Sequence, residues 1–224
     1  HAAVAMHARD EPPAAMRRRL EVDRERRPLA DRRALHRAQQ LRRLRRCRLL
    51  DDVVVATTVN ATDDPVVRLA DAEGVRWYRG SEHDVLGRYA AAAREADADL
   101  VVRSTADCPL IEPAVVDRVV AELSGHADDT DYASNVVRRS YPQGLDVEAF
   151  FGDVLARVDR MARSQPAREH VTYFVLQERP ELFAIRGVTE EDDSSAQRWT
   201  VDTAEDLALR RHHVRRRRDQ DGRS

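Results

Sequence analysis

The chain contains no lysine, because all 38 of its basic residues are arginines. Catalysis through a lysine amine is therefore excluded. Any contact with phosphate must come from arginine, whose planar guanidinium suits phosphate oxygens. Only two cysteines, Cys47 and Cys108, are present, which is too few for a disulfide framework. Since the sequence has no Cys/His cluster of the metal-binding type either, we expect a reduced, cytoplasmic setting.

Long apolar runs and a strong net charge are also missing. No stretch approaches the ~20 residues of a membrane span and no signal peptide is visible, so we predict no membrane association. The net charge of -2 gives no reason to expect nucleic acid as a partner. The composition, 42% hydrophobic and 35% charged, is typical of a single soluble domain over residues 1–224. The polar tail, residues 215–224, is expected to fray.

Short valine-rich runs alternate with amphipathic segments through the first half of the chain. We expect strands at residues 2–6, 52–56, 75–78 and 99–103. The intervening helices are expected at residues 28–46, 63–73 and 82–96, with a further helix at 113–123. This alternation predicts an α/β fold with a mixed, mainly parallel sheet and helices on both faces.

The pattern changes after residue 124. Short strands are predicted at residues 131–135 and 145–150, followed by helices at 152–163 and 166–178. A strand at 182–188 and a last short strand at 198–201 complete the series. The last strand would deliver Asp202 to an edge of the sheet.

Asp107 stands just past the predicted strand 99–103, in the stretch Ser104-Thr-Ala-Asp-Cys-Pro109. Ligands of open α/β sheets bind where the strands end, and Pro109 cannot continue a strand. A carboxylate at that place suits a hard cation such as Mg²⁺. From spacing alone, a carboxylate that caps the following helix or turn is an equally good explanation.

Several other side chains are candidates for the same edge. Asp202 follows a predicted strand as Asp107 does, so the two could hold one Mg²⁺, although their spacing alone is a weak signal. Arg79, Arg88 and Arg103 flank strand ends and are candidate phosphate or carboxylate ligands, with surface salt bridges as the alternative.

Two acidic positions and one histidine complete the candidates. Asp146 and Glu148 lie two apart on a predicted strand and therefore share one face of it. Glu169-His170 falls in a predicted helix, where a surface or packing histidine is the default interpretation.

Seven stretches occur in a fixed order over residues 49–209. They are residues 50–57, 79–89, 107–111, 134–135, 141–148, 168–172 and 200–207. As a set they resemble the cytidylyltransferase-like family of spore-coat polysaccharide biosynthesis, whose relatives are the acylneuraminate and Kdo cytidylyltransferases. No single stretch is specific by itself, whereas the ordered set is.

The resemblance implies a Rossmann-like nucleotide-diphospho-sugar transferase fold. It also implies a reaction in which a sugar hydroxyl attacks CTP, releases pyrophosphate and leaves a CMP-sugar. An aspartate from each of two segments would hold Mg²⁺, and these positions map onto Asp107 and Asp202. Beside the metal, Arg79 or Arg88 would spread the developing negative charge. We assign Arg79, Arg88 and Asp146 to catalysis, and Asp107 also to nucleotide binding.

The segment after the first strand departs from the family pattern. Relatives carry a glycine-containing loop there that wraps the triphosphate with backbone amides and with Arg and Lys. In this chain residues 10–16 contain two acids and two prolines and no glycine. Only Arg9 and the run 17–19, with Arg18 at its centre, remain as nucleotide ligands. We therefore expect CTP to bind weakly and to turn over slowly or not at all.

Three functions remain open from the sequence. The first is a Mg²⁺-dependent cytidylyltransferase of sugar or polysaccharide biosynthesis. The second is a binding or regulatory relative that keeps the fold without turnover, and the third is a glycosyltransferase that uses a preformed nucleotide sugar. A homodimer is one assembly that the sequence leaves open.

Overall fold

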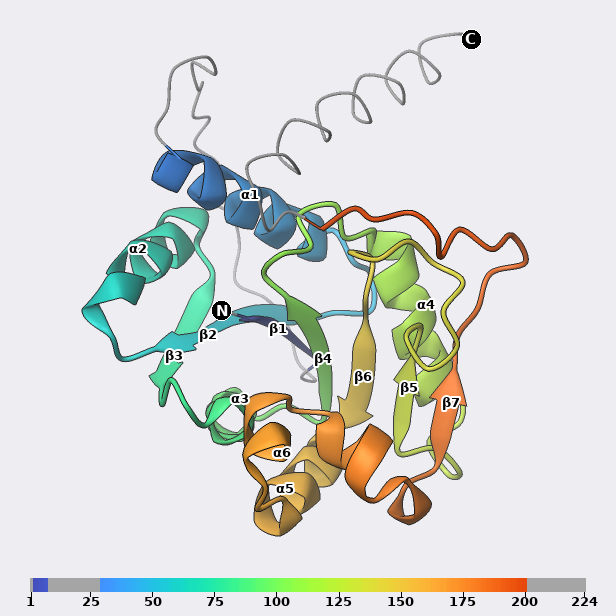
Figure 1. Cartoon of the computed structure of the whole chain (residues 1–224). Coiled ribbons are helices and arrows are strands. Elements are labelled where there is room, and N and C mark those ends of the chain that lie inside the picture. The colour runs from blue at the N-terminus through green and yellow to red at the C-terminus, as the bar shows by residue number, and fades with distance from the viewer. Residues whose placement is uncertain (1, 8–28, 201–224) are drawn as a thin grey trace, which may run out of the picture.

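The centre of the protein is one mixed sheet of seven strands in the order β3-β2-β1-β4-β6-β5-β7 (Figure 1). The computed structural model describes residues 2–7 and 29–200, with side chains from Ala34 onward. The strands are β1 Ala2–His7, β2 Asp52–Thr58, β3 Arg76–Gly80, β4 Leu100–Thr105, β5 Tyr132–Ser134, β6 Glu148–Phe151 and β7 Ile185–Gly187.

Six α-helices accompany these strands in the described residues. They are α1 Leu29–Leu44, α2 Asp64–Glu73, α3 Val85–Glu95, α4 Pro113–Ser124, α5 Gly152–Met161 and α6 Gln165–Glu169. Three shorter turns of helix occur at Ala61–Asp63, Phe174–Glu178 and Pro180–Leu182.

Local chemistry explains where several helices begin and end. Pro65 lies in the first turn of α2, where its missing N–H costs nothing, and Gly74 ends the helix with a φ of 64°. The Asp84 side chain caps α3 by accepting a hydrogen bond from the Gly87 backbone N–H. The Arg168 guanidinium pairs with the same carboxylate, so the start of α3 is tied to α6.

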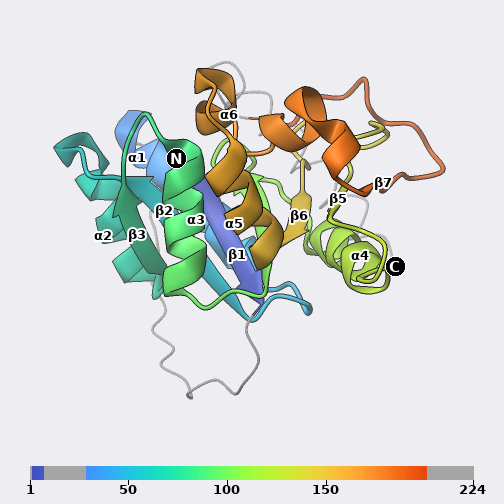
Figure 2. The same cartoon turned by 90° about the horizontal axis from the view of Figure 1, so that it is seen from below.

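The helices form two layers, one on each face of the sheet. Helices α1, α2 and α4 cover one face and α3, α5 and α6 cover the other, as Figures 1 and 2 show. In β4, Leu100 and Val102 pack into the first layer, whereas Val101 packs into the second. This two-sided burial explains why the central strands are continuous apolar runs rather than alternating ones. The predicted α/β class with helices on both faces is confirmed.

Strand direction differs from the prediction at β1. Five strands, β2, β3, β4, β5 and β7, run in one direction, whereas β1 and β6 oppose them. Four of the six neighbouring pairs in the described sheet are therefore antiparallel, and the expectation of mainly parallel pairing is wrong in this respect. An apolar run such as Ala2–His7 has a side-chain pattern that reads the same in either direction, so its sequence could not settle this.

Two predicted elements near the C-terminal end are shorter than expected. The helix predicted at residues 166–178 stops at Glu169 and resumes at Phe174 as a π-helical turn. Between these two turns, the Thr172 hydroxyl donates to the buried Glu148 carboxylate at 2.6 Å. In place of a strand at 198–201, the described residues up to Thr200 contain one bridge, between Gln143 and Arg198. The predicted frayed tail, residues 215–224, lies outside the described residues.

Within the described residues, none of the helices combines the length and the apolar character that crossing a bilayer requires.

Candidate active site

The parallel strands β2, β3 and β4 end at one edge of the sheet, at Thr58, Gly80 and Thr105. We refer to this edge as the carboxyl edge. Asp107 follows β4 by two residues and is half-buried there. It does not cap the next helix, because the N-cap residue of α4 is Glu112. Asp107 therefore lies where the strand–turn pattern predicted it, at the edge that binds ligands in open α/β sheets.

The Asp107 carboxylate has one partner among the described residues. The Cys108 thiol lies 3.7 Å from its Oδ1 atom, and no described arginine pairs with it. Cys108 is buried, and burial raises the pKa of its thiol, with the negative charges of Asp107 and Asp146 adding to the effect. Asp146 belongs to the same edge of the sheet, because Glu148, two residues after it, lies opposite Arg103, which is two residues before the end of β4.

Asp146 lies in the loop before β6 and is paired with an arginine that the sequence analysis did not select. Arg139 donates to both Asp146 carboxylate oxygens, at 2.7 and 3.0 Å. The hydrogen bond and charge of Asp146 raise the pKa of Arg139 further, against the opposing effect of burial. Asp146 was predicted to share a strand face with Glu148, but it precedes β6, which begins at Glu148. The position of Arg139 just before the matched stretch 141–148 was the only signal for it.

Glu148 is buried, and its carboxylate stabilises the fold through an ion pair and two hydrogen bonds. Its carboxylate pairs with Arg103 across the β4–β6 register and accepts hydrogen bonds from the Tyr132 hydroxyl at 2.7 Å and the Thr172 hydroxyl at 2.6 Å. Burial by itself would raise the pKa of Glu148, but the charge of Arg103 and these hydrogen bonds outweigh it and hold that pKa below its ordinary value. Arg103, a candidate phosphate ligand, is engaged in this pair.

Arg79 and Arg88 hold the loops that follow β2 and β3. Arg79 donates to the backbone carbonyls of Thr58 and Asn60, both at 2.7 Å, and pairs with Asp64 at 2.8 Å. Arg88 is 5% exposed and donates to the Ser81 carbonyl. No hydrogen bond or ion pair joins either arginine to Asp107 or Asp146, so their assignment to catalysis stays a prediction.

A close backbone crossing carries the end of the described chain to the Asp146 loop. Trp199 N–H donates to the Gln143 carbonyl at 2.6 Å, and Gln143 N–H donates to the Gln197 carbonyl at 2.9 Å. Gly144 has a φ of 103°, and a Cβ atom there would lie 2.7 Å from the Thr200 nitrogen. Glycine is required at this crossing because no other residue fits both the φ angle and the space. Thr200 therefore lies beside the loop that carries Asp146.

Three predicted ligands lie outside the described residues. They are Arg9, Arg18 and Asp202. The expected pairing of Asp107 with Asp202 stays a prediction for this reason. His7, the last described residue of β1, pairs with Leu100 at the amino end of β4, which is the opposite edge of the sheet from Asp107.

The Asp63 carboxylate holds the end of β2 through hydrogen bonds, and its shifted pKa predicts how the stability of the protein depends on pH. Its carboxylate accepts hydrogen bonds from the Thr57 hydroxyl at 2.9 Å and the Thr58 N–H at 3.0 Å, and also from the Thr58 hydroxyl. Burial would raise the pKa of Asp63, but these hydrogen bonds prevail and hold it below its ordinary value of 3.8. The stabilisation is then fully present above pH 3.8 and is lost as the pH falls through the lower folded-state pKa.

Asp63→Asn is therefore expected to lower the free energy of unfolding near neutral pH by roughly 2 kcal/mol. The difference from the parent protein should shrink below about pH 4, as the parent carboxylate takes up its proton. Urea unfolding followed by circular dichroism between pH 3 and 7 measures both effects. A difference that is constant across this range would contradict the assignment.

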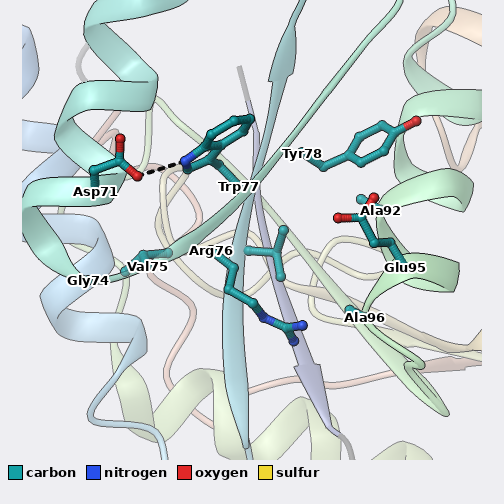
Figure 3. Close-up of a pocket in the computed structure, with 10 residues that line it drawn as sticks. Asp71, Gly74, Val75, Arg76, Trp77, Tyr78, Ala92, Glu95 and Ala96 are labelled. Carbon is teal, nitrogen blue, oxygen red and sulfur yellow. Dashed lines mark hydrogen bonds between the residues drawn. The ribbon is translucent and has the colours of Figure 1, made fainter.

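A cavity of about 410 Å³ opens beside β3, away from these residues. Figure 3 shows Trp77 and Tyr78 on opposite sides of the strand, with the Trp77 indole donating to Asp71 at 2.8 Å. Gly74 and Val75, at the amino end of β3, are among the residues that line this cavity. None of the predicted site residues lines it. The candidate site is therefore the carboxyl edge and not this cavity.

The ordered stretches of sequence and the acidic carboxyl edge agree with one family of proteins. The model of the cytidylyltransferase family matches residues 27–213. The chain belongs to this family. The match covers all seven ordered stretches of the sequence, from residues 50–57 to residues 200–207, so the resemblance drawn from the sequence is confirmed.

Two curated proteins are similar to this cytidylyltransferase-family chain. The chain is 34% identical to an uncharacterised protein, MJ1063, of Methanocaldococcus jannaschii, over 75% of this chain and 68% of that one. It is 28% identical to the spore coat polysaccharide biosynthesis protein SpsF of Bacillus subtilis, over 70% and 64% of the two chains. The chain thus spans about two thirds of the length of these curated relatives.

Solved structures confirm the predicted fold. A cytidylyltransferase from Leptospira borgpetersenii is 33% identical with a TM-score of 0.73, over 77% of this chain and 72% of that one. A CMP:2-keto-3-deoxy-manno-octonic acid synthetase solved with CTP is 15% identical with a TM-score of 0.59, over 81% and 88%. At that identity the second likeness supports the fold alone.

Proposed function

We propose that the protein transfers CMP from CTP to a sugar hydroxyl and releases pyrophosphate, as a step in the synthesis of a surface glycan. The observation that carries the proposal is the Asp107 carboxylate, which stands at the carboxyl edge without an arginine partner in the described chain. The match of the cytidylyltransferase family over residues 27–213 supports the reaction class.

A magnesium ion is the cofactor that this chemistry calls for. When bound, it supplies positive charge to the phosphates that the reaction rearranges. Asp107 fits such an ion, because a half-buried carboxylate at a ligand-binding edge is a suitable oxygen ligand. Among the described residues no three His, Cys, Asp or Glu side chains gather as a metal site. We propose that Asp107 and Asp202 are the two carboxylates that would hold the ion.

The residues of this chain would then bind and orient the substrates. Nucleotidyl transfer needs the sugar hydroxyl in line with the α-phosphate and positive charge around the phosphates. Asp107 would anchor the nucleotide through the metal, while Arg79 and Arg88 stabilise the loops that end β2 and β3. The buried Arg103–Glu148 pair would keep β4 and β6 in register, so that Asp107 and Asp146 face one site.

Pyrophosphate release with CTP and Mg²⁺, measured over a panel of acidic and neutral sugars, tests this proposal. Release that depends on CTP and on one sugar class supports the cytidylyltransferase. CTP binding without release favours a relative that binds but does not turn over. Release of a nucleoside mono- or diphosphate from a nucleotide sugar identifies a glycosyltransferase and refutes the proposal.

A relative that binds nucleotide without turnover is the second candidate. The segment 10–16 has no glycine, and Asp10 and Glu11 would repel a triphosphate. The pairing of His7 with Leu100 also ends β1 at the edge opposite Asp107, whereas the nucleotide loop of relatives follows the first strand. Both observations favour slow turnover.

Replacing residues 10–16 by a glycine-containing basic loop is therefore expected to raise the rate of pyrophosphate release about a hundredfold. The reason is that one missing donor to a developing anion costs roughly 3 kcal/mol. Single-turnover assays on both proteins measure the gain. If the parent protein already turns over at an ordinary enzymatic rate and Arg18→Ala abolishes it, the arginines at 17–19 replace the loop and this expectation is wrong.

A further inference from the structure

The Arg139–Asp146 pair is placed at the site and yet is accessible to solvent. The side chains are 35% and 31% exposed, and the pair is bidentate. Arg139 lies in the loop between β5 and β6, beside the stretch that crosses residues 197–200. Of the described arginines near the carboxyl edge, Arg79, Arg88 and Arg103 all hold backbone carbonyls or a buried carboxylate.

The free-energy cost of separating Arg139 from its partner is lower than the corresponding cost for those three arginines. Arg79 and Arg88 hold loops, and freeing them would leave backbone carbonyls without donors. Arg103 pairs with a buried carboxylate that would be left uncompensated. The partner of Arg139 is a third exposed, so water or a cation can replace the guanidinium there.

The position and the shape of the Arg139 guanidinium suit an anionic ligand. Its partner Asp146 lies at the carboxyl edge, because Glu148, two residues further on, is opposite Arg103 near the end of β4. The guanidinium fork that now fits the Asp146 carboxylate has the same geometry for a phosphate or for a sugar carboxylate.

We propose that Arg139 binds an anionic oxygen group of the substrate, either the triphosphate of the nucleotide or the carboxylate of a sugar acid, and that Asp146 holds Arg139 until that group replaces it. This inference rests on the proposed function and names an anion ligand of that same site. Asp146 is then a competitor of the substrate for Arg139, so the two members of one ion pair have opposite effects on binding. A pair that only stabilises the loop would give effects of the same sign.

The test compares Arg139→Gln, Asp146→Asn and the double variant with the parent protein. Arg42→Gln serves as the matched control, because Arg42 makes an equally bidentate pair with Glu73 on the surface between α1 and α2. Calorimetry measures the affinity for tripolyphosphate, CTP, 2-keto-3-deoxy-manno-octonic acid and the methyl ester of that acid. EDTA is present throughout, so that a metal ligand role of Asp146 does not contribute.

Arg139→Gln is expected to weaken one class of anion about tenfold, because it removes a charged bidentate contact. Loss for tripolyphosphate and CTP identifies the phosphates as the partner of Arg139. Loss for the sugar acid, but not for its ester, identifies the carboxylate. Asp146→Asn should tighten the same ligand about threefold, and this gain should vanish in the double variant.

Two results would overturn the inference. One is that Arg139→Gln changes every affinity by less than twofold, as Arg42→Gln should. The other is that Asp146→Asn weakens binding as Arg139→Gln does, which is the behaviour of a purely structural pair. If the parent binds none of the anions in EDTA, the inference fails, whereas the proposed function is still decided by pyrophosphate release in the presence of Mg²⁺. If tripolyphosphate binding depends on Arg139 but CTP binds no more tightly than UTP and no pyrophosphate is released, only the proposed function fails.

Discussion

Replacing Glu148 by alanine is expected to lower the free energy of unfolding by about 3 kcal/mol. The substitution leaves the Arg103 guanidinium between two central strands without its counter-charge, and it removes the acceptor of the Tyr132 and Thr172 hydroxyls. We expect the lower end of the usual cost of breaking a buried pair, because Arg103 keeps 21% of its side chain exposed. Urea unfolding followed by circular dichroism measures the loss.

A matched control and a rescue variant make this prediction specific. Glu181→Ala breaks the surface pair with Arg179, in which both side chains are about half exposed, and it should leave the urea midpoint nearly unchanged. Replacing both members together, as Arg103→Met with Glu148→Leu, should recover much of the stability, because no unpaired charge then remains buried. A loss no larger for Glu148→Ala than for Glu181→Ala would contradict the buried network.

Asp107→Asn is expected to lower the rate of Mg²⁺-dependent pyrophosphate release by about a thousandfold, while leaving the protein folded. The amide is a far weaker ligand for a hard cation, and a misplaced metal forfeits several kcal/mol of transition-state stabilisation. The thermal midpoint should change little, because the Asp107 carboxylate has only the weak Cys108 thiol contact among the described residues. Steady-state kinetics and a thermal unfolding curve separate the two effects.

Metal binding itself supplies a readout that does not depend on turnover. Mn²⁺ titration in the presence of CTP, followed by electron paramagnetic resonance, should show a site in the parent protein that Asp107→Asn weakens. Asp128→Asn is the control, because Asp128 is exposed in the turn after α4. Equal Mn²⁺ affinity in the Asp107 variant and the parent would exclude Asp107 as the metal ligand.

The sequence by itself determined the elements whose signals are local. Three consecutive valines at residues 53–55 predicted β2, and Pro65 and Gly74 marked the start and the end of α2. Each of these signals works over one or two turns of chain, through the φ limits of proline and glycine and the packing of β-branched side chains. The ordered stretches also predicted the family, because each is short and keeps its own spacing. The place of Asp107 at a strand end followed from the same local rules.

Only the tertiary structure decided which side chains meet and which way β1 runs. The sequence pattern could not show that Arg139 pairs with Asp146 or that Glu148 pairs with Arg103. It also could not predict that the helix breaks after Glu169, or that Thr172 donates to a carboxylate 24 positions away. Strand direction and charge pairing depend on partners far along the chain. The free energies of strand pairs and ion pairs depend on burial and geometry in the folded state, and a local pattern of residues does not determine either one.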